Sequence, residues 1–404
     1  MADSHSPAST TLVGERVRRL RLALGLTQAD LAAQAAMASG TVSMIENGLH
    51  STEPGVIRAL SEALDCKPAY LTVGSSDAAY DRPKLRAYAD ASQRAVDRTL
   101  FDSVTAIEAI RSIQLRPLPL KLPVYNGDLS DDDGIDRIAA DVRAAAGIDS
   151  HAVVPNVIRA AERLGCVVLP LDGELGRHWG MSLTVDEIPV IRVTRPSNDP
   201  EFDIPGDRQR FTVAHELGHL VLHAGSQQPA NPTDASRLER EANRFAAAFL
   251  VPGDMALEDL AAAGGRVTLT TMSALKQKWG YSIKAFVFRF KELGMIDDAQ
   301  ARSLYKQISA RRWNKDEPHR PGTEFAVWFA KALAEQFPGP NATEHAAARA
   351  ELGPSYLRRW LNWEPSGTPS VPATVTQLPS RTAHDPFPAR ERNARISRLP
   401  RRPS

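Results

Sequence analysis

The chain has 404 residues, of which 43% are hydrophobic and 24% are charged, and its formal net charge is +1. A chain of this length exceeds what one hydrophobic core usually supports, so we expect two or three domains joined by linkers. The apolar and charged fractions are typical of a soluble globular protein. The near-zero net charge excludes a global attraction to nucleic acid or to a membrane.

The cysteines and the apolar runs indicate the compartment. Cys66 and Cys166 are far apart in the chain, which argues against a disulfide framework and favours a reducing environment. No apolar run approaches the roughly 18 residues of a membrane-spanning helix. The first ten residues lack the charged and apolar regions of a signal peptide. We therefore expect a cytoplasmic protein that has no membrane partner.

The N-terminal region, residues 12–75, has the pattern of several short helices. One apolar helical face ends at Gly25, Thr27 is a suitable N-cap for the next helix, and Gly48 closes a third one. Two short helices joined by a tight turn form a helix-turn-helix, whose second helix fits the major groove of DNA. The small, polar residues that precede this region are expected to be mobile.

Residues 76–130 are predicted to be a linker. It contains one long helix at about residues 98–115, which the prolines of RPLPLKLP end. The polar stretch DLSDDDG follows and is expected to cap the next helix.

The region from residue 131 to residue 312 predicts a helical domain with a small sheet. Helix, helix and strand are expected between residues 135 and 171, and two further strands at 180–185 and 188–193 are spaced like a hairpin. Residues 195–207 have the composition of a loop, and helices dominate after it. The predicted fold class is mostly α, of the α+β type.

The C-terminal part divides in two. Residues 313–363 predict a small helical region, whereas residues 364–404 contain eight prolines and seven arginines and are expected to be disordered. Core packing is predicted for four apolar residues at helical spacing, namely Phe325, Trp328, Phe329 and Leu333.

The segment FTVAHELGHLVLH, residues 211–223, has the pattern of a metal site. His215 and His219 are four residues apart, so on a helix both imidazoles face the same way and can bind one metal ion. Glu216 lies next to them, close enough to act as general base on a metal-bound water, which completes the HExxH pattern of zinc peptidases. The alternative is a helix whose histidines are solvated or hydrogen-bonded.

A catalytic zinc ion takes three protein ligands and keeps one open position. The third ligand is predicted on a second amphipathic helix, residues 236–252, where Glu239 lies beside the apolar face. Asn243 is on the same side of that helix and can hydrogen-bond the outer nitrogen of a ligand histidine. Glu241 points elsewhere and is the fallback ligand. We therefore expect one zinc ion on His215, His219 and Glu239.

Other residues near this motif also have predicted roles. Gly218 is expected to allow the close approach of a neighbouring element. His223 falls at the end of its helix, where a protonated imidazole interacts favourably with the helix dipole, and oxyanion stabilisation is the alternative. The strand at 180–185 is a candidate edge strand that holds an extended substrate by backbone hydrogen bonds.

The N-terminal region resembles the Xre/Cro/CI family of repressors over about residues 12–73. The resemblance is carried by LGLTQADLA, VSMIENG and IRALSEALDCKPAYL. It implies a DNA-binding domain of five helices, usually dimeric, in which Arg21 pairs with Glu46 to hold the fold. The implied DNA contacts are Gln28, Ser39, Gly40, Thr41, Ser43, Met44 and Asn47, with Gln28 and Asn47 near phosphate.

Two features of this region depart from the repressor pattern. Ala38 stands where a capping Ser or Thr is usual, and the base-reading positions carry no Gln, Arg or Asn. Six basic and six acidic residues make the region nearly neutral, although the arginines cluster on its first helix. The alternative to DNA binding is a helix-turn-helix used for protein contact or dimerisation.

The stretches RQRFTVAHELGHLVLH and EREANRFAAAFLVP resemble the ImmA/IrrE family of metallopeptidases, with a similarity that extends over about residues 135–312. The resemblance implies a zincin-like fold with His215, His219 and Glu239 as ligands and Glu216 as catalytic base. It also implies a gluzincin-like mechanism, in which the base passes a proton from the attacking water to the leaving amine.

The two resemblances together predict a transcriptional regulator with zinc-dependent endopeptidase activity. The family implies a helix-turn-helix repressor as substrate, cleaved to relieve repression. That repressor is either a separate protein or this chain itself, cut in its own linker. The alternative is a plain regulator, or an antitoxin-like protein, whose metal domain is sensory or structural.

Overall fold

The computed structural model describes residues 7–50, 52–73, 79–81, 91–129, 131–171, 175, 178–199, 203–225, 229 and 231–366. Several predictions fall at least partly outside the described residues: the mobile N-terminus at 1–6, linker residues 76–78, 82–90 and 130, loop residues 200–202, and the tail at 367–404. Within the described part of the chain, no helix has the length and apolar character needed to cross a membrane.

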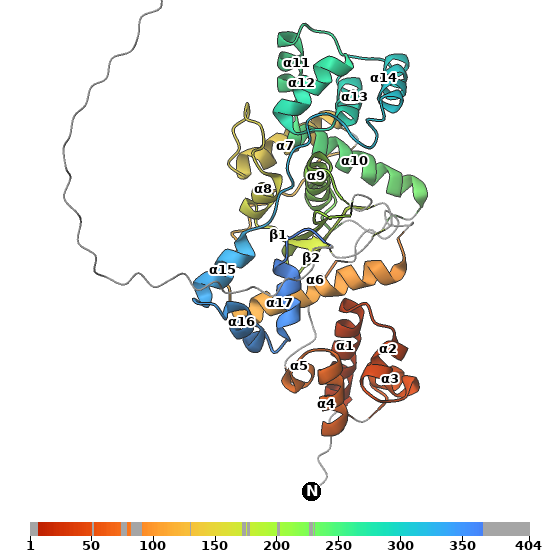
Figure 1. Cartoon of the computed structure of the whole chain (residues 1–404), viewed down its shortest axis with the longest axis vertical. Coiled ribbons are helices and arrows are strands. Elements are labelled where there is room, and N and C mark those ends of the chain that lie inside the picture. The colour runs from red at the N-terminus through yellow and green to blue at the C-terminus, as the bar shows by residue number, and fades with distance from the viewer. Residues whose placement is uncertain are drawn as a thin grey trace, which may run out of the picture. The chain divides into compact units, whose positions relative to one another are not determined.

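The N-terminal region consists of five helices, as predicted, and the first begins at residue 7 rather than near residue 12 (Figure 1). Thr27 caps the second helix and forms a capping box with Asp30, whereas Ala38 offers the third helix no side-chain cap. Gly25 lies in the left-handed region with φ +69°, which a helix-ending glycine adopts without strain. The helices are α1 Pro7–Ala23, α2 Gln28–Gln34, α3 Ser39–Glu46, α4 Pro54–Ala63 and α5 Pro68–Thr72.

The long helix of the predicted linker is α6, Gln93–Ile113. It begins five residues earlier than the sequence pattern predicts, because Ser92 caps its N-terminus by accepting a hydrogen bond from the backbone N–H of Ala95. Gln114 ends it in the left-handed conformation, just before the proline-rich stretch. Asp131 in turn caps the next helix, as expected for that polar stretch.

The sheet has three strands in the order β1-β3-β2, formed by β1 Val167–Leu171, β2 Gly180–Val185 and β3 Ile188–Thr194. β1 runs parallel to β3, and β2 pairs antiparallel with β3 in the predicted hairpin. Asp186 and Glu187 form its two-residue turn, both with positive φ, which matches the right-handed twist of the strands. β2 therefore pairs with β3 along one edge, and among the described residues its other edge has an isolated bridge between Tyr80 and Val185.

Helices surround the sheet and complete the domain, so the predicted fold class, mostly α with a small sheet, is confirmed. α9 packs on β2, on β3 and most extensively on α10 (Figure 1). The helices are α7 Asp132–Ala145, α8 Val157–Arg163, α9 Gly206–Leu222, α10 Pro232–Leu250, α11 Gly253–Ala262, α12 Leu269–Trp279, α13 Ile283–Glu292 and α14 Asp298–Ala310.

The C-terminal part begins with an extended segment, residues 313–327, that packs across α8, α9, α12 and α13. Its Glu324 accepts hydrogen bonds from the N–H groups of Val157 and Ile158 at 2.7 and 3.0 Å, which caps α8, and it also pairs with Arg210. The segment leads into α15 Trp328–Gln336, α16 Ala342–Ala350 and α17 Pro354–Leu361.

Two predictions for this C-terminal part need correction. Phe325 is 57% exposed, because the helix starts only at Trp328 and Phe325 lies in the extended segment before it. Phe329 and Leu333 are buried, as predicted. The first residues of the expected disordered tail are ordered, since Ser366 exchanges backbone hydrogen bonds of 2.9 Å with the loop at 196–198.

The buried hydrophobic residues form two large clusters on opposite faces of the sheet. Val168 of β1 belongs to the cluster with α7–α14, whereas Val167 and Leu169 belong to the cluster with α1–α6 and α15–α17. The alternation follows from the two-residue period of a strand. The helix-turn-helix therefore shares a core with α6, one sheet face and the C-terminal helices.

Candidate metal centre

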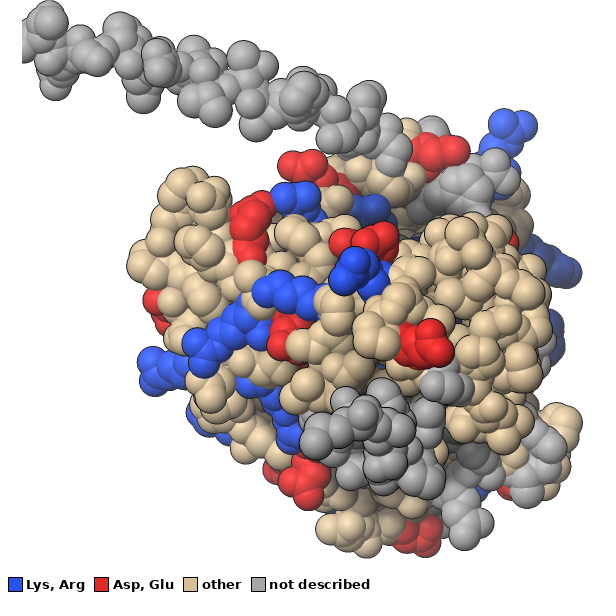
Figure 2. Space-filling model, turned by 90° about the horizontal axis from the view of Figure 1, so that it is seen from below, with Lys and Arg blue, Asp and Glu red and all other residues tan. Residues whose placement is uncertain are grey.

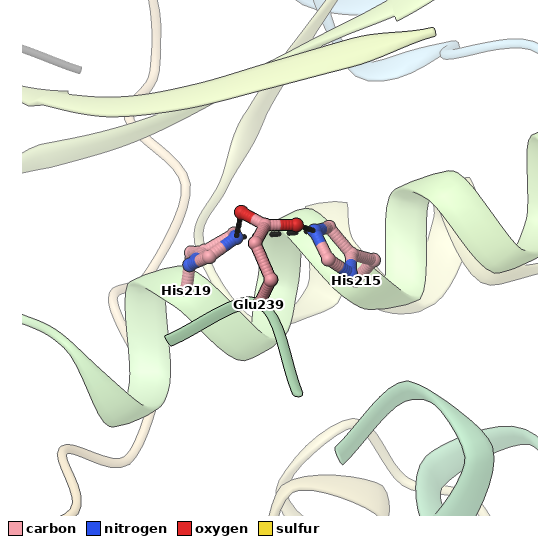
Figure 3. Close-up of side chains that lie close together, drawn as sticks. All are labelled: His215, His219 and Glu239. Atoms are coloured by element: carbon pink, nitrogen blue, oxygen red, sulfur yellow. Dashed lines mark hydrogen bonds and ion pairs between the residues drawn. The ribbon is translucent and has the colours of Figure 1, made fainter. Parts of the chain in front are cut away.

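Three side chains from α9 and α10 converge on one point, as Figure 3 shows. The Nε2 atoms of His215 and His219 lie 3.1 Å apart, and each is 3.3 Å from a carboxylate oxygen of Glu239. Among the described residues, they form the group of His, Cys, Asp and Glu side chains that could hold a metal ion.

The spacing of these donor atoms fits a zinc ion. Zinc bonds of about 2.0–2.1 Å in tetrahedral geometry place neighbouring ligand atoms roughly 3.3–3.4 Å apart. The observed separations of 3.1 and 3.3 Å lie close to that value. Two imidazoles and one carboxylate are also the donor types of catalytic zinc sites. The residues present therefore fit this metal.

The close packing of α9 and α10 brings the three residues together. A Cβ atom at Gly218 would lie 3.0 Å from Cδ1 of Phe245 and 3.2 Å from the carbonyl oxygen of Ala242. Only a glycine leaves this space free, in agreement with the close approach predicted there. Because Ala242 lies on α10 within one turn of Glu239, the helix separation at Gly218 sets the position of that carboxylate.

Glu216 lies beside the three residues and is 4% exposed. The hydroxyl of Ser182 on β2 donates a hydrogen bond of 2.6 Å to its carboxylate. Burial raises the pKa of Glu216 to about 7, although nearby His215 and the Ser182 hydrogen bond favour the ionised form. A carboxylate with this pKa can both accept and release a proton near neutral pH.

Burial and mutual contacts also determine the protonation of the other groups. Burial lowers the pKa of His219 to about 4. Burial alone would raise the pKa of Glu239, but hydrogen bonds from His215 and His219 outweigh it and hold that pKa below its usual range. Burial alone would lower the pKa of His215, yet its hydrogen bond to Glu239 leaves that pKa raised. A neutral His219 beside an ionised Glu239 suits cation binding.

The outer nitrogen atoms of the two histidines have different partners. Nδ1 of His215 lies 3.0 Å from Oδ1 of Asn243, the arrangement that the sequence predicts. Nδ1 of His219 lies 3.0 Å from Nδ1 of His223, which was not expected. Glu241, the fallback ligand, contacts Nε2 of His223 at 2.9 Å and does not belong to the converging group.

Sequence reasoning missed Ser182 at this site, and it did not predict the contact between His219 and His223, for which there was a usable signal. His223 follows His219 by four residues, so the helical spacing alone places both rings on one face. Ser182 precedes Glu216 by 34 residues, and its proximity depends on how the sheet packs against α9. No local pattern marks such a contact.

Apart from Gln28, which begins α2, the residues with predicted DNA contacts lie on α3 and at its C-terminal end. Four of them are exposed, namely Ser39, Gly40, Met44 and Asn47, and two are half-buried, namely Thr41 and Ser43. Gln28 is half-buried and donates a hydrogen bond of 2.8 Å to Glu46. Glu46 also pairs with Arg21, as the family resemblance implies. Gln28 therefore contributes to the packing of α2 against α3 here.

The arginine cluster of α1 is mostly internal, which corrects the interpretation that it favours DNA binding. Arg16, Arg19 and Arg21 are each at most 9% exposed. Arg16 donates to the backbone carbonyl groups of residues 70 and 73, and Arg19 pairs with Glu108 of α6. The exposed basic residues of the module are Arg18, Arg58 and Lys67. Figure 2 accordingly shows charges of both signs interspersed rather than one basic surface.

Comparisons with known proteins find two family matches in the chain. Residues 161–291, which include β1–β3, α9, α10 and the converging residues, match the family model of the IrrE N-terminal-like domain, a peptidase family. Residues 17–71 match the helix-turn-helix family model. The two matches confirm the predicted fusion of a helix-turn-helix with an ImmA/IrrE-like segment. A comparison with curated proteins finds no significant match.

Proposed function

We propose that this protein is a DNA-binding regulator and a zinc-dependent endopeptidase that cleaves a helix-turn-helix repressor and so relieves repression. The family matches support the two coarser parts, a DNA-binding regulator and a peptidase-type enzyme. The observation that carries the finer proposal is the convergence of His215, His219 and Glu239 at zinc-like spacing, with Glu216 beside them.

Each residue of the site has a proposed role. His215, His219 and Glu239 would hold one zinc ion, and Asn243 orients the ring of His215. The bound zinc would polarise the peptide carbonyl group and acidify the attacking water. Glu216 accepts the proton of that water and returns it to the leaving amine.

The edge of β2 that does not pair with β3 is the proposed binding site for the substrate backbone. At its far end, Thr184 accepts a hydrogen bond of 2.9 Å from the N–H of Asp81, and Asp186 donates one of 2.7 Å to Ala79. This edge therefore already accepts an antiparallel segment of the chain. Ser182, next to Glu216, lies on the same strand, so a peptide added at 180–182 would pass close to the catalytic base.

The helix-turn-helix has a proposed role in DNA binding. α3 would enter the major groove, with Ser39, Gly40, Thr41, Ser43 and Met44 at the base edges. Gln28 and Asn47 would lie near phosphate, which for Gln28 requires its hydrogen bond to Glu46 to break. We also propose a homodimer, as is usual for repressors of this type.

A matched pair of chains tests the peptidase proposal. Glu216→Gln keeps the shape of the base and is expected to retain zinc while losing proteolysis. Cells that express either the wild type or this variant are compared by labelling new protein N-termini. A new N-terminus within a helix-turn-helix protein, present only with the wild type, supports the proposal. If both chains give the same N-termini and equal repression, the plain-regulator or antitoxin-like alternative is correct.

The same variant separates self-cleavage from cleavage of another chain. A tagged Glu216→Gln chain, mixed with untagged wild type and zinc, can be cut only by a second molecule. Cleavage of the untagged chain alone, at a rate independent of concentration, indicates cutting within one molecule. Cleavage of neither indicates that the substrate is a separate repressor or that an activating signal is absent.

A further inference from the structure

A line of buried hydrogen-bonding side chains extends outward from His219. Nδ1 of His219 contacts Nδ1 of His223 at 3.0 Å, and Nε2 of His223 contacts the carboxylate of Glu241 at 2.9 Å. The guanidinium group of Arg237 lies 3.2 Å from the other carboxylate oxygen. His223 is 2% and Glu241 is 7% exposed, so water does not replace these contacts.

The two helices that supply the converging residues also supply this line. His223 follows the last residue of α9, and its backbone N–H bonds to the carbonyl group of His219 at 3.1 Å. Glu241 lies on α10 two residues after Glu239, so the two carboxylates diverge, one toward the histidine pair and one toward His223. The packing of α9 on α10 thereby fixes both.

The proton positions along this line follow from what each group can donate. An ionised carboxylate only accepts hydrogen bonds, so Nε2 of His223 carries the proton that Glu241 accepts. A neutral imidazole has one N–H, which leaves Nδ1 of His223 as an acceptor. When Nε2 of His219 binds a metal ion, the ring proton must be on Nδ1, which then donates to Nδ1 of His223; without a metal ion, Glu239 competes for that proton at Nε2.

We propose that His223, held by Glu241, is a positioning residue that fixes the Nδ1–H tautomer and the ring orientation of His219 for metal binding. It performs for His219 the task that Asn243 performs for His215. This inference rests on the proposed function insofar as His219 is a zinc ligand. His223 also stands at the C-cap of α9, as the sequence-based interpretation places it, and the proposed role adds the contact of its ring with His219.

The tautomer of His219 can be read directly in zinc-free, full-length Glu239→Ala, in which no carboxylate competes for the proton at Nε2. Long-range ¹H–¹⁵N correlation spectra of histidine rings distinguish Nδ1–H from Nε2–H forms. In that background we expect His219 to be Nδ1–H and to shift toward Nε2–H when His223→Phe is added, which keeps a ring but removes the acceptor. His219 in the Nε2–H form in Glu239→Ala overturns the inference, whether or not the wild type binds zinc.

Zinc affinity, measured by competition with a chelator, is the second readout. His223→Phe is expected to bind zinc 10–100-fold more weakly, the usual cost of losing such an outer partner. His223→Asn places an amide oxygen where Nδ1 stood and is expected to remain within a few-fold of the wild type. Equal affinity of all three proteins contradicts a positioning role, and equal loss in both variants indicates mere packing.

Two further variants keep the test decisive. If His223→Phe unfolds because Glu241 loses its partner, the double variant with Glu241→Leu removes the buried charge and is expected to show the same loss of affinity. His345→Phe, at an exposed position on α16, controls for the substitution itself. A wild type that binds no zinc refutes the metal centre, whereas the tautomer spectrum still decides the role of His223.

Discussion

Replacing Gly218 by alanine tests how tightly the spacing of α9 and α10 controls the metal centre. The added Cβ would lie 3.0 Å from Cδ1 of Phe245 and 3.2 Å from the carbonyl oxygen of Ala242. The ring of Phe245 is fully buried, and the carbonyl group belongs to helix backbone, so neither yields easily. We therefore expect α10, and Glu239 with it, to move away from α9 by a few tenths of an ångström.

Two opposing effects determine how far Gly218→Ala changes the free energy of unfolding. Alanine is favoured over glycine within a helix by about 0.5–1 kcal/mol. Overpacking of a buried interface costs about 1–3 kcal/mol. The overpacking effect is larger, so the variant should lose up to about 2 kcal/mol of unfolding free energy. Zinc binding must restore the native helix spacing, and strain of about 1–2 kcal/mol weakens an equilibrium about 5–30-fold.

Chemical denaturation of the zinc-free protein and chelator competition measure the two effects. Gly55→Ala is the matched control, because Gly55 also lies in a helix and a Cβ there has open space within 4 Å. The control should be as stable as the wild type or slightly more stable, with unchanged zinc affinity. If Gly218→Ala behaves like Gly55→Ala in both measurements, helix spacing at Gly218 does not control the centre.

Three further predictions concern other parts of the chain. Asp102 is buried, which alone would raise its pKa, but two guanidinium groups and an indole N–H outweigh burial and hold that pKa below its usual value. The ionised form of Asp102 therefore stabilises the fold at pH values above the ordinary pKa of an aspartate. This contribution is lost as the pH falls through the lowered pKa. Asp102→Asn should cost about 3–5 kcal/mol at pH 7 in thermal unfolding, and the deficit should shrink below about pH 4. Ser182→Ala should retain zinc but slow cleavage and alter the pH–rate profile, since Glu216 loses a hydrogen bond; an unchanged profile would count against this contact. Arg18→Gln should weaken DNA binding and reduce the salt slope by about 1, whereas buried Arg21→Gln should act by destabilising the domain; equal slopes for both would disprove this distinction.

The sequence predicts most of the converging group, because the residues that form it lie on two helices and obey short-range spacing rules. His215 and His219 lie on one helix, where a spacing of four residues fixes their relation before any tertiary contact forms. Glu239 and Asn243 follow the same logic on a second helix. The position of Glu239 relative to the histidines depends on the close helix packing at Gly218, and the sequence also predicts that Gly218 allows a neighbouring element to approach closely.

The contacts that the sequence does not predict join distant segments. Arg19 pairs with Glu108, 89 residues further along the chain. The arginine content of α1 alone therefore does not predict that Arg19 is buried. Phe325 has helical spacing to its neighbours, but capping contacts from Glu162 start the helix at 328. Burial and pairing of this kind depend on tertiary packing, which local periodicity does not predict.

The zinc content of single-residue variants on α10 tests the central claim most directly. Wild type, Glu239→Ala, Glu241→Ala and Arg240→Ala are purified without metal, loaded at saturating zinc and analysed for bound metal. The exposed Arg240 is the control for the helix surface. One equivalent is expected in every chain except Glu239→Ala, which should lose tight binding. A wild type without zinc, or a Glu239→Ala chain with wild-type affinity, would contradict the proposed centre.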